Sequence, residues 1–90
     1  MPKRRRPRAS PKGVGRLEKV FGRVLREIRK QHGFTQEALG FESDYDPTYI
    51  GQLERGQKSP SLRTIVALAS ALKTPGSEIL GRVEARLKRA

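Results

Sequence analysis

Apolar residues recur at helical spacing in two stretches of this 90-residue chain. The first stretch keeps a period of about 3.6 residues over about three turns. Its apolar positions are Leu17, Val20, Phe21, Val24, Leu25 and Ile28. The second stretch repeats the period behind Ser61, a predicted N-cap, at Leu62, Ile65, Leu68, Ala69 and Leu72. The pattern therefore predicts one amphipathic helix that ends near Gly33 and another that Thr74 and Pro75 stop.

Two helix-start signals lie between these stretches. Thr35 and Asp46 are both suited to accept a hydrogen bond from the first turn of a helix, and Pro47 fits the first helical position. Each cap is framed by an apolar pair that can close over the helix start, Phe34 with Leu39 and Tyr45 with Ile50. Gly56 can take the left-handed conformation that ends a helix after Arg55. The segment 35–56 is therefore predicted to be a helix-turn-helix unit.

The last part of the chain favours one more helix. A short fifth helix would carry Ile79 and Leu80, and Val83 and Leu87 can prolong it at a spacing of four residues. No strand pattern competes with the helical ones. The expected fold is all-α, a compact five-helix bundle. Its helix-turn-helix domain covers 16–81, and 82–90 form a short basic C-terminal helical extension.

Residues 1–15 differ in composition from the rest of the chain. They are rich in Pro, Gly and basic residues and have almost no apolar side chains to bury, so they cannot offset the entropy of becoming ordered. We expect a disordered basic N-terminal arm. Its cations, together with Arg16, are Lys3, Arg4, Arg5, Arg6, Arg8 and Lys12, with no acidic residue among them.

Charge is unevenly distributed along the chain. The formal net charge of +11 points to a polyanionic partner. The segment 31–54, however, holds no Lys or Arg, and its acidic residues are Glu37, Glu42, Asp44, Asp46 and Glu54. Attraction to phosphate must therefore come from the arm, the first helix and the loop that contains Arg55, Lys58 and Arg63.

Several classes of protein are disfavoured by the composition. There is no cysteine, which removes disulfides and thiolate metal sites and fits a reducing cytoplasm. No apolar run approaches the ~18 residues that a membrane span needs, and the basic N-terminus lacks the apolar segment of a signal peptide. One His and no phosphate-cradling glycine loop leave no catalytic constellation. We therefore expect that the protein is not an enzyme and that it binds no cofactor and no metal.

The motifs of the central segment resemble one known family. They are Thr35-Gln36-Glu37-x-Leu39-Gly40, then Thr48-Tyr49-Ile50-x-Gln52-Leu53-Glu54-Arg55-Gly56, then Pro60-Ser61-Leu62. In these residues the chain resembles the Cro/C1-type (XRE) helix-turn-helix regulators, over about 17–80. The resemblance implies a lambda-repressor-like DNA-binding bundle. The family usually has Gly in the sharp turn where this chain has Asp44, a residue type that tolerates the left-handed conformation.

The resemblance also implies which residues meet DNA. In the family the second helix of the unit lies in the major groove, which makes Pro47, Thr48, Gly51 and Gln52 the candidate base-reading residues. Gln52 can pair with adenine through one donor and one acceptor, Thr48 offers a hydroxyl and a methyl, and Gly51 leaves room for the duplex. Candidate contacts to the DNA backbone are Gln36, Tyr49, Arg55, Lys58, Arg63 and the arm residues Lys3, Arg4, Arg5, Arg6 and Arg8.

Three side chains have structural interpretations. Tyr49 fits either a half-buried ring with an exposed hydroxyl or a phosphate contact. Arg29 and Glu54 match a family pair that bridges the first and third helices.

Three functions fit these observations. The first is a sequence-specific transcriptional regulator in the cytoplasm of a bacterium or phage-infected cell, associated with the nucleoid. It would bind a near-palindromic operator as a homodimer, with Ile79, Leu80, Val83 and Leu87 as the dimer seam. The second is an antitoxin whose partner is a toxin protein. The third is a bridging coactivator that contacts the transcription machinery. The operator, the sign of regulation and any effector are not determined by the sequence.

Overall fold

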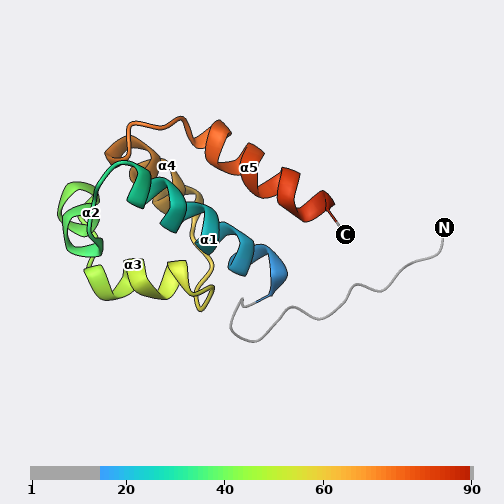
Figure 1. Cartoon of the computed structure of the whole chain (residues 1–90). Helices are drawn as coiled ribbons and strands as arrows, with labels where there is room; N and C mark the ends of the chain where they lie inside the picture. Colours follow the sequence, from blue (N-terminus) through green and yellow to red (C-terminus); the bar gives the residue numbers. More distant parts are fainter. Residues whose placement is uncertain (1–14, 90) are drawn as a thin grey trace.

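The computed structural model of the protein describes residues 15–89, which form five helices and, over that range, no strand. The helices are α1 (Arg16–Gln31), α2 (Gln36–Ser43), α3 (Pro47–Glu54), α4 (Leu62–Ala71) and α5 (Gly76–Lys88). Helix α1 packs against α5 and α3, and α2 lies at one end against α3 and α4 (Figure 1). The predicted all-α, five-helix fold is confirmed. The arm lies outside the described residues, apart from Gly15.

One apolar core is built from all five helices. Burying one Leu or Ile side chain contributes about 1.5–3 kcal/mol, so this core is the main stabilising feature of so small a fold. Its buried members are Val20, Phe21, Val24, Leu25 and Ile28 of α1, Leu39 of α2, Ile50 and Leu53 of α3, Leu68 and Ala69 of α4 with Leu72 after it, and Ile79 and Val83 of α5.

Side-chain caps fix three of the helix starts. The Thr35 hydroxyl accepts a hydrogen bond from the amide of Ala38 at 3.0 Å, and the Asp46 carboxylate accepts one from the amide of Thr48 at 2.7 Å. Ser61 caps α4 in the same way, through the amide of Thr64 at 3.0 Å. The three caps predicted from the sequence are confirmed, which explains why α2, α3 and α4 begin where they do.

Two residues of the predicted apolar helix faces are not part of the core. Leu17 is 52% exposed and Leu62 is 75% exposed. Both stand in the first turn of their helix, at the margin of the core. The expected end of α3 is also one residue too late, since the helix ends at Glu54 and Arg55 caps it.

Helix α5 requires a correction to the predicted dimer seam. It runs unbroken from Gly76 to Lys88, although the sequence suggested a separate extension from position 82, and it packs along α1. Ile79 and Val83 are each only 1% exposed and belong to the core of the protomer itself, so they are not available to a second copy. Leu80 is 39% exposed, and Leu87 is half-buried against the same core. The proposed seam is therefore wrong in Ile79 and Val83, because the face of α5 that carries them is the face that α5 packs inward.

Candidate nucleic-acid interface

The turn between α2 and α3 is tight and brings the two helices together. Asp44 adopts the left-handed conformation with φ 66°, and the amide of Tyr45 donates to the carbonyl of Gly40 at 2.9 Å. A Cβ on Gly40 would lie 2.5 Å from the Tyr45 carbonyl oxygen, so the turn passes directly over that glycine. Asp44 thus adopts a conformation that usually favours glycine, as its residue type allows.

Helix α3 presents one polar side to solvent. Ile50 and Leu53 have no exposed surface and point into the core. Thr48 is exposed, and Pro47 and Gln52 are partly exposed. Thr48 and Gln52 stand four residues apart and so share a face of the helix. The outward-facing set expected from the sequence is therefore brought together on α3, with Gly51 as the exception.

Gly51 is buried, and the space beside it is filled by the protein itself. A Cβ there would lie 3.2 Å from the Arg55 guanidinium and 3.5 Å from the side-chain oxygen of Gln36. The expectation that Gly51 leaves open space for the duplex is therefore wrong in this structure. The missing side chain instead allows Gln36 and Arg55 to approach each other over α3.

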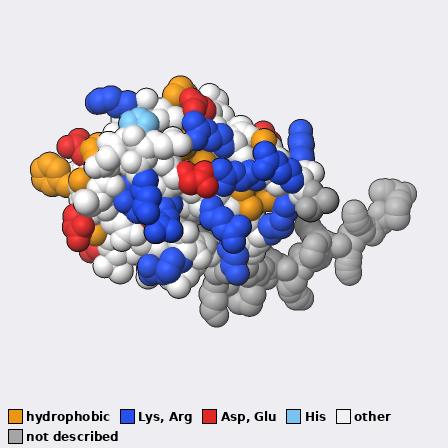
Figure 2. All heavy atoms as spheres, viewed as in Figure 1, with side chains coloured by type: hydrophobic (Ala, Val, Ile, Leu, Met, Phe, Trp, Pro, Cys, Tyr) orange, Lys and Arg blue, Asp and Glu red, His pale blue; other side chains and the backbone are white. Residues whose placement is uncertain are grey.

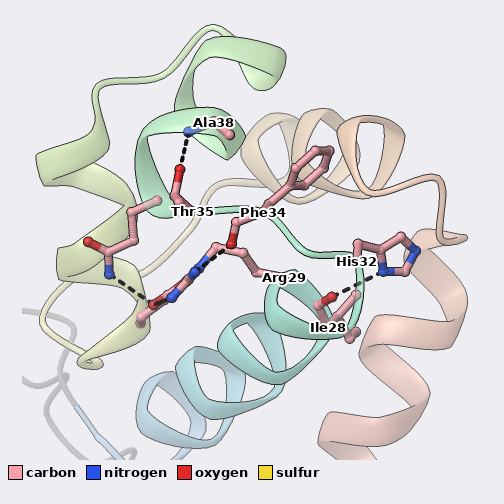
Figure 3. Close-up of polar contacts among 8 residues, drawn as sticks. Ile28, Arg29, His32, Phe34, Thr35 and Ala38 are labelled. Carbon is pink, nitrogen blue, oxygen red and sulfur yellow. Dashed lines mark hydrogen bonds and ion pairs between the residues drawn. The ribbon is translucent and has the colours of Figure 1, made fainter.

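The carboxylate of Glu54 joins three elements. Its two oxygens accept hydrogen bonds from Arg29, at 2.5 Å from Nε and 3.0 Å from Nη2, and Oε1 also accepts one from Gln36 at 3.0 Å. Arg29 in turn donates from Nη1 to the carbonyl oxygen of Phe34 at 2.8 Å (Figure 3). Arg29 and Glu54 are 7% and 8% exposed, so the expected bridge between α1 and α3 is present and is buried. This network positions Gln36 at the start of α2.

The first turn of α2 lies beside this network. Figure 3 shows Thr35 capping the amide of Ala38 close to the Arg29 side chain, at the helix start where Gln36 stands. Unpaired amides and the helix dipole make such a start favourable for an anion. His32 lies at the other end of the loop, where its Nδ1 is 3.1 Å from the carbonyl oxygen of Ile28.

Tyr49 is half-buried beside α4. Its hydroxyl lies 3.5 Å from the Thr64 hydroxyl, and its ring centroid is 5.3 Å from that of Tyr45. Thr64 is buried, and its hydroxyl also lies 3.1 Å from that of Tyr45. The structure therefore has the half-buried ring, one of the two interpretations of Tyr49. Thr64 was not singled out from the sequence, because its partners Tyr45 and Tyr49 are distant along the chain.

The expected phosphate-binding cations lie around α3. Arg55, Lys58 and Arg63 are all exposed, in the loop after α3 and the first turn of α4. Arg55 also donates to the side chain of Gln57 at 3.4 Å. The arm residues Lys3, Arg4, Arg5, Arg6 and Arg8 lie outside the described residues.

The described part of the chain also lacks two other features. Residues 15–89 hold no group of three His, Cys, Asp or Glu side chains placed to hold a metal ion. No helix in that range is both long enough and apolar enough to cross a membrane.

Comparison with known proteins identifies the family. A helix-turn-helix family model matches residues 25–79. The chain belongs to the helix-turn-helix family. The resemblance to Cro/C1-type regulators is thereby confirmed, and the matched range contains α2, α3 and α4 whole.

Named relatives are regulators. The chain is 37% identical over 62 residues to the control protein C.BamHI of Bacillus amyloliquefaciens, covering 68% of this chain and 76% of that protein. The crystal structure of the restriction-modification controller C.AhdI from Aeromonas hydrophila has 44% identity and a TM-score of 0.67, and covers 68% of this chain and 92% of that one. The clp gene regulator ClgR from C. glutamicum has 27% identity and a TM-score of 0.77, with coverages of 82% and 96%.

Proposed function

We propose that this helix-turn-helix protein regulates transcription by binding a near-palindromic DNA site as a homodimer, with α3 in the major groove. Family membership and the regulatory relatives make it a DNA-binding transcriptional regulator. These relatives favour that function over the antitoxin and coactivator alternatives. The observation that carries the proposal is the outward polar side of α3, where Thr48 and Gln52 stand clear of the core. A regulator of this kind acts on the nucleoid in the cytoplasm.

Base reading is assigned to the first turns of α3. Gln52 can donate to and accept from the edge of adenine, and Thr48 can contact a base through its hydroxyl or a thymine through its methyl. Pro47 lies at the same end of the helix, where the chain would enter the groove. Gly51 contributes through its backbone only, beneath Gln36 and Arg55.

Phosphate binding is assigned to the residues around α3. The buried network holds Gln36 at the start of α2, where a phosphate would also meet the helix dipole. Arg55, Lys58 and Arg63 are exposed beside α3, and the Tyr49 hydroxyl lies at the α3–α4 junction. The arm residues Lys3, Arg4, Arg5, Arg6 and Arg8 would add contacts along the backbone.

A second copy would fit an apolar surface on α4 and α5. Three large hydrophobic side chains on these helices are exposed although the core is small. They are Leu62 at 75%, Val66 at 58% and Leu80 at 39%. Leu62 and Val66 stand one turn apart on α4, and Leu80 follows on α5. We assign the dimer contact to this surface in place of Ile79 and Val83. Two copies would double the number of base pairs read, which matches a two-fold symmetric site.

Selection of bound sites from random DNA tests the proposal. We expect enrichment of one sequence with two inverted half-sites about one helical turn, or a multiple of it, apart. Enrichment of a single half-site would support base reading by α3 but would contradict binding as a homodimer. If no sequence is enriched while DNA still binds, α3 does not read bases and the proposed function is wrong.

A further inference from the structure

A strongly basic hollow lies between the first half of α1 and the end of α5. Its volume is about 560 Å³, and the residues that line it are Gly15, Arg16, Lys19, Val20, Arg23, Arg86 and Arg89. Figure 2 shows Lys and Arg side chains gathered over α1 and the end of α5, while acidic side chains gather at the opposite, left edge over α2. We call this hollow the α1–α5 groove. It has five cationic lining residues and no acidic one.

Two of these cations are held in place by the fold. The Arg16 guanidinium donates to the carbonyl oxygens of Arg86, Leu87 and Arg89, at 3.3, 3.0 and 3.1 Å. It therefore supplies a donor to the carbonyls of Leu87 and Arg89 at the end of α5, and it shares the Arg86 carbonyl with the amide of Arg89. Arg86 forms an ion pair with Glu27 of α1. The two ends of the groove wall are thus tied together by side chains from both helices.

The other three cations have no such partner. Lys19, Arg23 and Arg89 are exposed, and within residues 15–89 none of them forms an ion pair. Like charges this close repel one another, and a concave wall concentrates their field. The row from Arg16 to Arg23 extends roughly 10 Å along α1 at 1.5 Å per residue. Such a row matches an extended polyanion better than a single small ion.

The α1–α5 groove begins next to the DNA-binding unit. Gly56, which follows α3, packs so closely on α1 that a Cβ there would lie 2.7 Å from Cγ and 2.8 Å from Cα of Lys19. The exposed cations of the loop after α3, Arg55 and Lys58, are therefore close in sequence to a residue that touches the groove. The cation-rich arm also joins the described chain at Gly15, in the groove wall.

We propose that the α1–α5 groove is a second nucleic-acid site, which binds phosphodiester groups outside the bases that α3 meets. The proposal rests on the proposed function. Segment 31–54 has no Lys or Arg, so α2 and α3 themselves offer no cation to a phosphate. The groove supplies cations around Lys19, the α1 residue on which Gly56 of the α3–α4 loop packs. The phosphates belong either to the flanks of the bound duplex or to a second duplex.

The first experiment compares two charge-matched variants of the full chain. Arg23→Gln/Arg89→Gln removes two groove cations whose side chains make no ion pair within residues 15–89. Lys73→Gln/Lys88→Gln removes two exposed cations that do not line the groove. Binding is measured by fluorescence anisotropy against salt. One duplex has only the selected site, and another extends it by about one helical turn, ~10 base pairs, on each side.

We expect the groove variant to lose affinity for DNA of any sequence and the control variant to keep it. Each lost phosphate contact flattens the plot of log K against log salt by about 0.9, so the groove variant should lose about 2 per protomer. If the two variants lose the same amount, only net charge matters and the proposal is overturned. The proposal is also overturned if the groove variant binds both duplexes like the wild type and loses only binding to polyglutamate or to anionic phospholipid vesicles.

A second measurement separates the two sources of phosphate. If the flanks occupy the groove, the extended duplex binds the wild type more tightly than the short one, and the groove variant loses that gain. If a second duplex occupies it, the wild type brings two differently labelled duplexes within energy-transfer range and the groove variant does not. Non-cognate duplexes report the groove independently of base reading. A wild type that shows no sequence preference would therefore disprove the proposed function, while non-cognate duplexes would still test the groove.

Discussion

At the scale of single residues, the two sides of α3 do different work. Glu54 points inward, where it holds Arg29 and Gln36 in a buried network. Removing one partner of a buried ion pair is strongly destabilising, because it leaves an uncompensated buried charge. Gln52 stands on the polar side, and within residues 15–89 its side chain makes no hydrogen bond, so its donor and acceptor can both meet a base edge. Position within one short helix therefore separates a structural residue from one that we propose reads a base.

Gln52→Ala should weaken binding to the selected site by about 1–3 kcal/mol, because a bidentate contact to one base is lost. Binding to a scrambled duplex should change little. Gln31→Ala, an exposed glutamine at the end of α1, is the matched control and should change neither. Titrations of both duplexes check this. An equal loss on both would place Gln52 among the phosphate contacts.

At the scale of elements, a glycine in α1 allows α3 to pack closely against that helix. A Cβ on Gly22 would overlap the carbonyl oxygens of Leu53 and Glu54, which belong to the backbone and cannot rotate away. Gly81 of α5 is also helical, but a Cβ there would have no neighbour within 4 Å. The two glycines thus share a helical conformation and differ only in whether another element lies against them.

Gly22→Ala should destabilise the protein by about 1–3 kcal/mol, because α1 and α3 must separate to admit the methyl group. Gly81→Ala should instead stabilise it by about 0.5–1 kcal/mol, since alanine loses less backbone entropy in a helix. Urea unfolding monitored by circular dichroism measures both. A loss of stability in both variants would mean that α5 around Gly81 is packed against something.

The end of α5 is joined to α1 by a pH-sensitive contact. A hydrogen bond from Arg86 lowers the pKa of Glu27, and the same bond raises the pKa of Arg86. A carboxyl whose pKa is lowered by folding stabilises the fold above its unfolded value, about 4.3. That contribution is lost as the pH falls through the lower, folded value. The pair is partly exposed, so it is worth about 0.2–1 kcal/mol.

Glu27→Gln should therefore lower the melting temperature at pH 7 and have little effect below the folded pKa of Glu27. Thermal melts of the wild type and the variant between pH 7 and pH 3 measure the difference. Glu84→Gln is the control, since Glu84 is exposed and forms no ion pair within residues 15–89. A difference between wild type and Glu27→Gln that does not change with pH would show that the charge of Glu27 is not what holds α5.

At the scale of the whole molecule, apolar and charged surfaces are segregated. The exposed apolar side chains to which we assign the dimer contact are Leu62 and Val66 of α4 and Leu80 of α5. Among the large hydrophobic residues of 15–89, Phe41 is the most exposed, at 84%, but it stands on α2 in the acidic segment. The cations gather on the arm, α1 and α5. Self-association and attraction to DNA are thus assigned to different surfaces.

Val66→Glu should convert a dimer to a monomer and weaken operator binding at least tenfold, because a charge would be buried in the contact. Phe41→Glu is the matched control and should leave the mass unchanged. Sedimentation at tens of micromolar protein, with thermal melts to confirm folding, measures this. A wild type that is monomeric under these conditions and binds its operator as one copy would contradict the homodimer.

Deletion of residues 1–14 should weaken binding to selected and scrambled DNA alike. The deleted segment holds the cations Lys3, Arg4, Arg5, Arg6, Arg8 and Lys12. Each phosphate contact contributes about 0.9 to the salt dependence, so the slope should flatten by several units for a dimer. Titrations at several salt concentrations measure it. An unchanged slope would show that the arm makes no contact with DNA, whereas lost preference among sites would show that it reads a groove.

Local signals in the sequence determined most of the fold. The caps Thr35, Asp46 and Ser61 and the left-handed Gly56 fix where helices begin and end, because each interaction spans only a few residues. The helical period likewise identified the inward residues of α1 apart from Leu17, and the motif around Gln52 identified the family.

The tertiary structure alone decided which surfaces remain free. A helical period defines an apolar face but not the neighbour that covers it, so Leu62 was expected inside, and Ile79 and Val83 were expected at a dimer contact. The burial of Gly51 and the cationic groove have the same origin, because they depend on residues far apart in the chain. Arg16 and Arg89 are 73 positions apart, and only the packing of α5 along α1 brings them together.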